Sequence, residues 1–377
     1  MEFARVFLCY EQFEVKRDFT TSPSKFSPRI PPLLNNNMTS LAAASSSVPP
    51  TPDSAKLLQR LSRVLRNDDV QVVFLNGAGM SVASGIPDFR SAGGLYETLR
   101  PELLTATPAQ RQALADNPTG VVSWGLFREN TFPYLEVRRP FILGIAEQRW
   151  KPTVAHFFAR VCHDKGKLKS ILTQNIDGLD YHTGIPSEKV VSVHGSMGQV
   201  RCEGCSTFID PEEFKNSVRS KIKDIYCMDD DAPKQSTEII CPACNRPLVK
   251  PNTVLYGRSL PPEFYAAVED AFPRGGGYVD VLFVVGTSLT VQPAASVPRL
   301  ATMSMRVVVN MEIVGESVFD FSEGSRDMLL RGECDSIFVD LAIACGWLDD
   351  LASHADLMCE SSRALVLRRV AEEQKST

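Results

Sequence analysis

Apolar residues follow two spacings along this chain, one typical of helices and one typical of buried strands. A helical spacing begins after Pro52, where Asp53 or Ser54 can cap the first turn. Its apolar face consists of Leu57, Leu58, Leu61, Val64 and Leu65. A second helical pattern covers residues 154–161. Continuous apolar runs, expected for strands buried on both faces, occupy residues 70–75, 170–173, 190–193, 279–285 and 306–309. Short strands alternating with helices predict an α/β fold with a parallel, doubly wound sheet.

Three of these predicted strands are followed at once by polar or glycine-rich motifs. The motifs are Asn76-Gly-Ala-Gly79, Gln174-Asn-Ile-Asp177 and Gly286-Thr-Ser288. Ligands of doubly wound sheets bind at the carboxyl ends of the strands. The sequence therefore predicts one site where the three motifs meet.

Residues 1–52 differ in composition from the rest. Between Thr20 and Thr51 there is no acidic residue, and Ser, Pro, Asn and Ala dominate. Such a segment buries too little apolar surface to offset its ordering entropy, so we expect a disordered tail. Acidic residues at Glu2, Glu11 and Asp18 argue against a transit peptide.

Charge and hydropathy narrow the classes of partner. The net charge of −5 over 377 residues gives no basic field for nucleic acid, so we expect no sequence-specific nucleic-acid binding. No apolar run reaches the ~18 residues of a membrane helix. The features leave the compartment open among cytoplasm, nucleus and mitochondrion.

The first motif can approach a phosphate. Gly77 and Gly79 follow a strand directly, where glycines let backbone amides come close to a diphosphate. The small pair Ser84-Gly85 comes too late for Gly-x-Gly-x-x-Gly, so a purely structural loop stays an alternative. The continuation Asp88-Phe89-Arg90 adds an anion, an aromatic plane and a cation, which is unusual for a dehydrogenase.

Two further motifs carry polar groups suited to a nucleotide. Gln174 and Asn175 can hydrogen-bond ribose hydroxyls or a carboxamide, and Asp177 can accept from an amide. His194, in Val-His-Gly, can move protons near neutral pH. Alone, the former could be a strand end with a turn and the latter a structural histidine.

Four cysteines have the spacing of a zinc site. Cys202-x-x-Cys205 and Cys241-x-x-Cys244 each form one knuckle, and two knuckles complete a tetrahedral shell of four thiolates. A redox Cys-x-x-Cys explains two such pairs poorly. A closed shell leaves no open position, so we expect a structural ion. The connecting loop, residues 206–240, is longer than usual and is predicted to be an exposed excursion.

Read in order over residues 55–345, the motifs resemble the sirtuin (Sir2) family. The matching segments are GAGMSVASGIPDFRS, TQNIDGLD, VHG, the paired CxxC, GTSLTVQP and VVVN, in wording similar to the deacetylase-type branch. The resemblance implies a catalytic domain over residues 53–345, with a Rossmann-like NAD domain. It also implies a smaller module of a zinc ribbon (about 196–250) and helices (about 94–159). Residues 346–377 would be a C-terminal extension.

The resemblance also assigns roles to residues. It makes His194 the general base and Asn175 a second catalytic residue. It implies an NAD site formed by Gly77, Ala78, Gly79, Ser81, Asp88, Phe89, Arg90, Gln174, Asn175, Ile176, Asp177, Gly286, Thr287, Ser288, Asn310 and Cys334. In the implied reaction NAD is a co-substrate: the acetyl group moves from lysine to ADP-ribose, and nicotinamide leaves.

Substrates of the implied reaction are acyl-lysine proteins, bound as an added strand. The edges of that strand would be formed by Val254, Gly257 and Val291. Relatives that take succinyl groups use Tyr-x-x-Arg, whereas this chain has Tyr134-Leu-Glu-Val-Arg138, so acetyl is favoured. Mono-ADP-ribosyl transfer, deacylation of other acyl groups, a non-enzymatic binding module and a dehydrogenase are the alternatives.

We predict that the substrate groove favours acidic flanking residues. The family's common Val-Phe-Phe-Gly-Glu is replaced here by Val254-Leu-Tyr-Gly-Arg258, which reverses one charge beside the groove. Acetyl-lysine peptides with Asp or Glu beside the acetylated residue should show higher kcat/KM than peptides with Lys or Arg there. An Arg258→Glu variant should reverse that order, and an equal preference in the unaltered protein would contradict the prediction.

Overall fold

The computed structural model of the protein describes residues 52–86, 96–273 and 279–376. Residues 51–377 form one compact unit. The predicted tail, apart from Pro52, lies outside the described residues, as do Asp88, Phe89 and Arg90.

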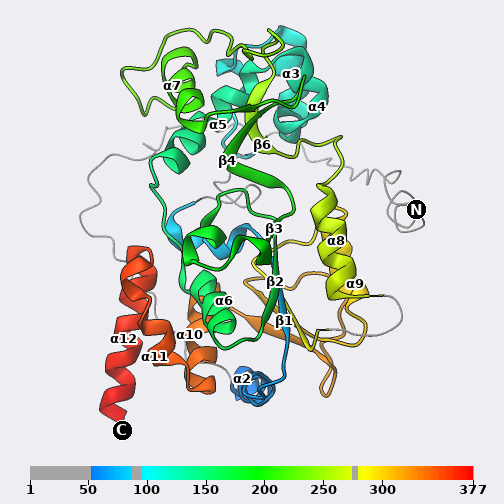
Figure 1. Ribbon diagram of the computed structural model, residues 1–377, viewed down its shortest axis with the longest axis vertical. Coiled ribbons are helices and arrows are strands. Elements are labelled where there is room, and N and C mark those ends of the chain that lie inside the picture. The colour runs from blue at the N-terminus through cyan, green and yellow to red at the C-terminus, as the bar shows by residue number, and fades with distance from the viewer. Residues whose placement is uncertain (1–51, 87–95, 274–278, 377) are drawn as a thin grey trace, which may run out of the picture. The chain divides into compact units, whose positions relative to one another are not determined.

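A parallel sheet forms the larger part of this unit (Figure 1). Its strands run in the order β3-β2-β1-β7-β8-β9, and every pairing is parallel. They are β1 (Val72–Asn76), β2 (Leu168–Thr173), β3 (Val190–Ser192), β7 (Val281–Val285), β8 (Met305–Asn310) and β9 (Asp327–Arg331). All residues of β1 and β7 are buried, which explains their unbroken apolar runs. The predicted α/β fold is confirmed, and β9 is a strand that the apolar pattern did not reveal.

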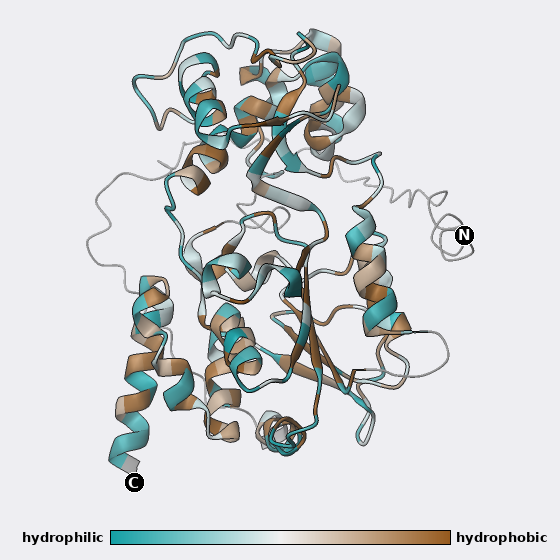
Figure 2. Cartoon of the chain, in the orientation of Figure 1, coloured by the Kyte–Doolittle hydropathy of each residue, from teal (hydrophilic) through white to brown (hydrophobic). Residues whose placement is uncertain are grey.

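Helices cover the sheet and share an aromatic core with it. Phe74 and Phe283 of adjacent strands stack with ring centroids 4.7 Å apart, and Phe158 lies 4.8 Å from Phe338 of the covering helices. The helices packed into this core are α2 (Pro52–Leu65), α6 (Val154–Asp164), α10 (Cys334–Cys345), α11 (Leu348–Ala352) and α12 (Glu360–Ser376). Figure 1 shows α8 (Pro262–Ala271) across the sheet from α6, near α9 (Val297–Leu300). The strands of this sheet are mostly hydrophobic, whereas α12 is mixed (Figure 2).

A smaller antiparallel sheet and four helices form a second core. Its strands β4 (Gly195–Cys202), β5 (Phe208–Ile209) and β6 (Val249–Thr253) run in the order β5-β4-β6. The helices are α3 (Pro108–Asp116), α4 (Trp124–Glu129), α5 (Phe132–Ala146) and α7 (Pro211–Lys221). Segments 104–143 and 197–255, far apart in sequence, contribute to one buried apolar cluster.

Short 3-10 helices join these elements. They are η1 (Ala78–Ser84), η2 (Pro101–Leu103), η3 (Pro118–Val122), η4 (Leu179–Thr183), η5 (Ser187–Lys189), η6 (Ala294–Ser296) and η7 (Ala355–Leu357). No helix within the described ranges has the length and apolarity needed to cross a bilayer.

The loop between the cysteine pairs is exposed over much of its length, as expected, but it also contains a helix and buries several side chains, which the sequence interpretation did not foresee. Helix α7 lies within it and buries Phe214 and Val218, and the loop beyond buries Ile222 and Ile239. The missed signal is the helical spacing of Phe214 and Val218, after an Asp-Pro start at Asp210.

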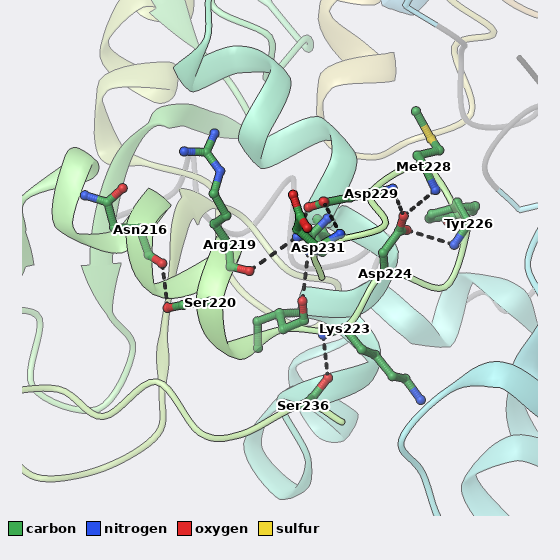
Figure 3. Close-up of polar contacts among 12 residues, drawn as sticks. Asn216, Arg219, Ser220, Lys223, Asp224, Tyr226, Met228, Asp229, Asp231 and Ser236 are labelled. Carbon is green, nitrogen blue, oxygen red and sulfur yellow. Dashed lines mark hydrogen bonds and ion pairs between the residues drawn. The ribbon is translucent and has the colours of Figure 1, made fainter. Parts of the chain in front are cut away.

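A buried arginine fixes this loop to α5, and Figure 3 shows polar contacts within the loop. The Arg139 side chain is 3% exposed, and its Nη2 pairs with Asp229 at 2.5 Å. Its Nε donates to the Ile222 carbonyl at 2.8 Å. Asp224 in turn accepts hydrogen bonds from the backbone amides of Tyr226, Met228 and Asp229. The loop is thus held at a defined position over the helix.

Arg139→Ala should loosen the loop and lower the free energy of unfolding by about 1–3 kcal/mol, because buried acceptors lose a charged donor. Urea denaturation measures the stability, and trypsin digestion should show faster cleavage between residues 219 and 234. Arg149→Ala, which removes an exposed arginine paired with Glu147, serves as the control. Equal cleavage rates for the two variants would contradict the role given to Arg139.

Candidate functional site

The three motifs meet at one edge of the large sheet. β1 lies between β2 and β7, with Asn76 opposite Thr173 on one side and Val285 on the other. All three strands run in the same direction, so the residues that follow them lie together. The Gln174 amide donates to the Asn76 carbonyl at 2.9 Å, which joins the first two motifs directly.

The first and third motifs pack backbone against backbone. A Cβ on Gly77 would lie 2.5 Å from the Thr287 Cβ, and one on Gly286 would lie 2.5 Å from the Met80 amide nitrogen. Gly286 also has φ +57°, a left-handed conformation that favours glycine. The amides of Gly77 and Gly79 donate to the carbonyls of Val285 and Gly286, each at 2.8 Å. These glycines therefore permit the close packing of the two loops.

A buried polar network joins the first motif to the second. The Ser81 hydroxyl donates to Asp177 Oδ2 at 2.7 Å. Asn175 Nδ2 donates to the Gly77 carbonyl at 3.0 Å and contacts Ser81 Oγ at 3.2 Å. Burial raises the pKa of Asp177, and the nearby His156 opposes that shift. The network fixes the amide and carboxylate that the sequence assigned to a nucleotide pocket.

Two residues missed by the sequence interpretation support this network. Thr153, the N-cap of α6, donates its hydroxyl to the Met80 carbonyl at 3.0 Å. His156 Nδ1 lies 2.8 Å from the Thr153 hydroxyl, and burial lowers the pKa of His156 to about 4, which keeps it neutral. The available signal was the capping box, Thr153 with His156 three residues later.

Gln174 and Thr287 connect the second motif to the third. Gln174 Nε2 donates to the Thr287 hydroxyl at 3.1 Å and to the Asn76 carbonyl at 3.2 Å. Asn76 Nδ2 donates to Asp180 Oδ1 at 3.0 Å. The ends of β1, β2 and β7 are therefore held together by side chains as well as by strand pairing.

His194 is oriented by the second motif. Its Nδ1 lies 2.9 Å from the Gln174 carbonyl oxygen, a geometry in which Nδ1–H donates and Nε2 carries the lone pair. Among the described residues, Nε2 is buried and has no hydrogen-bond partner. Burial lowers the pKa of His194 below its usual 6.5. Its Nε2 is thus free to accept a proton.

The predicted substrate edge begins at this histidine. The Val254 amide donates to the His194 carbonyl at 2.8 Å. Tyr256 is tied through its amide to Val122 and through its carbonyl to the Trp124 amide. Gly257 is exposed, and neither its amide nor its carbonyl has a partner among the described residues. At Gly257 this edge therefore has exposed backbone groups available for hydrogen bonding.

The remaining predicted cofactor residues lie along the same edge. Ser288 is exposed and its hydroxyl lies 2.9 Å from that of Thr290. Asn310 ends β8, and its carbonyl accepts from the Gly332 amide at 3.0 Å. Cys334 begins α10, just after β9. Ala78 begins η1 beside Gly77.

Two other predicted residues, Ile176 and Val291, have different surroundings, as does Tyr134 of the Tyr134-Leu-Glu-Val-Arg138 sequence. Ile176 is buried in the core of the smaller module, and its carbonyl accepts from the Met197 amide. Val291 is half-buried, and its carbonyl accepts from the Ala295 amide at 2.9 Å. Tyr134 is buried on α5, with its hydroxyl 2.9 Å from that of Thr253.

The four cysteines fit a tetrahedral metal site. Their sulfur atoms all lie within 4.8 Å of one another. Cys202 and Cys244 are 3.6 Å apart, and Cys205 and Cys241 are 3.7 Å apart, sulfur to sulfur. Zinc–thiolate bonds of ~2.3 Å in a tetrahedron require sulfurs about 3.8 Å apart. Donor type, number and spacing therefore all suit a zinc ion bound by the protein alone.

Known proteins are similar to this chain in sequence and in fold. Residues 77–293 match the Sir2 family. The chain is 31% identical over 312 residues to the NAD-dependent protein deacetylase hst2 of Schizosaccharomyces pombe, with 82% of each chain covered. It is 32% identical over 297 residues to the NAD-dependent protein deacetylase sirtuin-3 of Mus musculus, with 78% of each covered. The solved structure "Structural Basis for the Mechanism and Regulation of Sir2 Enzymes" matches with a TM-score of 0.58 at 26% identity, over 77% of this chain and 98% of that one.

Removal of zinc should destabilise the smaller module. Purified protein should contain about one zinc per chain, and a chelator should release it together with a fall in melting temperature, since the ion joins two segments of the core. Cys205→Ser should lose the zinc. Cys227→Ser changes an exposed cysteine outside the cluster and should keep it. Zinc content that is equal in the two variants would exclude this site.

Proposed function

This chain belongs to the Sir2 family, and from that premise we propose that it is an NAD-dependent deacetylase of protein lysines. The observation that carries the proposal is the position of His194. Its Nδ1 faces the Gln174 carbonyl, and its carbonyl accepts from Val254, so it lies between the nucleotide motifs and the substrate edge. A base at that position can serve both reactants.

The residues at the carboxyl edge of the sheet are proposed to bind NAD. NAD supplies an electrophilic ribose carbon, whose bond to nicotinamide breaks, and the ADP-ribose that receives the acetyl group. Ser81, Asn175 and Asp177 would orient the ribose and nicotinamide end, because their network is buried and rigid. Thr287, Ser288, Asn310 and the start of α10 at Cys334 would contact the adenosine end.

His194 is proposed to act as the general base. Its buried Nε2 accepts a proton from a ribose hydroxyl, and the Gln174 carbonyl stabilises the resulting imidazolium through Nδ1–H. The role of Asn175 is to hold the loop at Gly77 in the geometry this transfer requires.

The substrate is proposed to be an acetyl-lysine segment of a protein. Strand addition needs open backbone groups in the groove, and Gly257 supplies them. The Tyr134 hydroxyl already pairs with Thr253, which supports an acetyl group over a dicarboxylic one. The net charge of −5 favours a protein over a nucleic acid as the macromolecular substrate. We propose the cytoplasm or the nucleus as the compartment.

His194→Ala should lower kcat for NAD-dependent deacetylation by about 10²–10⁴-fold, the usual contribution of a general base. Release of nicotinamide and of deacetylated peptide measures it. His163→Ala, at the far end of α6, is the matched control and should retain full activity. An unchanged kcat in the His194→Ala variant would contradict the assignment of His194 as the general base. If labelled NAD leaves its ADP-ribose on protein instead of on the released acetyl group, the activity is ADP-ribosyl transfer and not deacetylation.

The pH profile should follow the same histidine. A general base acts in its neutral form, and burial lowers the pKa of His194, which favours that form. The base is therefore predominantly in its active, neutral form at pH 7, and that form is lost as the pH falls through a value below 6.5. We expect kcat/KM to be flat near pH 7 and to fall on the acid side. A midpoint above 7 would contradict this environment for His194.

A further inference from the structure

The C-terminal helix reaches the nucleotide loop. Helix α12 packs beside α10 and α11 (Figure 1), and its first turn contacts η1. The Ser361 hydroxyl donates to the Ala83 carbonyl at 2.8 Å, across a separation of 278 residues. The Cys359 thiol points to the same carbonyl oxygen at 3.4 Å.

The Ala83 carbonyl needs such a partner because of its place in η1. It lies at the end of the 3-10 helix, where Gly85 reverses the chain with φ +82°. The last carbonyls of a helix find no donor within it and accept from groups outside. The first turn of α12 provides those donors.

The same turn is itself firmly anchored. The Cys359 amide donates to the Pro152 carbonyl at 2.9 Å. The Ser362 hydroxyl donates to the buried Asp335 at 2.5 Å, and Asp335 also accepts from the Ala155 amide at 3.2 Å. Ser361 is therefore presented from a rigid base made by the starts of α6 and α10.

Together with its other contacts, η1 is held from several sides. Thr153 bonds the Met80 carbonyl, Ser81 bonds Asp177, and the Ser84 hydroxyl donates to the Lys151 carbonyl at 2.5 Å. Ser361 completes the set at Ala83. Ser81 and Ala83, the residues at which these contacts are made, both lie in the short helix η1. A shift at Ala83 is therefore expected to move Ser81 and the other η1 residues assigned to NAD.

We propose that Ser361 is a positioning residue for NAD, through which the C-terminal helix sets the affinity of the nucleotide loop. The proposal rests on the proposed function. Ser361 lies on the surface and is bonded to η1, so its effect on NAD is exerted through η1. Its loss should weaken NAD binding and leave acetyl-peptide binding unchanged.

Full-length Ser361→Ala and the double variant Cys359→Ala, Ser361→Ala test this. One net hydrogen bond corresponds to a roughly three- to tenfold change in affinity. We expect the KM for NAD, and the Kd for ADP-ribose by calorimetry, to rise by about that factor in Ser361→Ala and further in the double variant. The KM for peptide and kcat at saturating NAD should stay within about twofold. Ser361→Thr keeps the hydroxyl and should restore the affinity.

Ser353→Ala is the matched control, because it removes an exposed hydroxyl of the same extension that bonds the Asp350 carbonyl. Its NAD affinity should be unchanged. The proposal is overturned if Ser361→Ala and the double variant bind ADP-ribose like the control. It is also overturned if the KM values for NAD and peptide rise together with a lower melting temperature, which indicates a general structural role. Absence of deacetylation in the unaltered protein would instead refute the proposed function, since ADP-ribose binding requires no turnover.

Discussion

The contact between Gly77 and Gly286 determines the geometry on which the whole site depends. A Cβ on Gly77 would lie 2.5 Å from the Thr287 Cβ and 2.7 Å from the Gly286 carbonyl oxygen, and a Cβ on Gly286 would lie 2.5 Å from the Met80 amide nitrogen. With glycine at both positions, the loops after β1 and β7 meet directly and form hydrogen bonds between their backbone amides and carbonyls. Glycine loses more backbone entropy on folding than other residues do, and this structure places it where no other residue fits.

Each polar residue of the site takes its position from that contact. Asn175 bonds the Gly77 carbonyl, so the second motif is aligned on the first. Gln174, the residue before Asn175, is thereby placed, and its carbonyl orients the ring of His194. The His194 carbonyl then fixes Val254, the residue that follows β6 in the smaller module. One series of hydrogen bonds therefore passes from the nucleotide loop to the substrate edge and connects the two apolar cores.

The sequence predicted what short-range patterns encode and missed what long-range side-chain contacts decide. Buried parallel strands, the convergence of their carboxyl ends and the cysteine knuckles follow from local spacing, and all could be predicted. The strand β9 has the sequence Asp-Met-Leu-Leu-Arg, which is too short an apolar run to stand out. The bond from Ser361 to Ala83 joins residues 278 apart, and no local pattern announces it. Arg139 likewise lies in a plain helical stretch, and only the folded loop shows why a charge is buried there.

The charge beside the substrate edge depends on the zinc knuckle. Glu203 lies between Cys202 and Cys205, and its carboxylate pairs with both Lys250 at 2.9 Å and Arg258 at 3.2 Å. The Lys250 side chain is 1% exposed, so its ammonium group needs this anion, and it also donates to the carbonyls of Pro251 and Thr253.

Arg258 is 46% exposed and is held 4.8 Å from the centre of the Trp124 ring. The single carboxylate of Glu203 thus pairs with two cations, Lys250 and Arg258, so the three side chains together keep one net positive charge, on the exposed side at Arg258. Because Trp124 and Glu203 restrict the guanidinium, less entropy is lost when it meets an anion. The exposed half of Arg258 is therefore a pre-organised partner for a carboxylate next to the groove, and its position relies on the fold that the four cysteines stabilise.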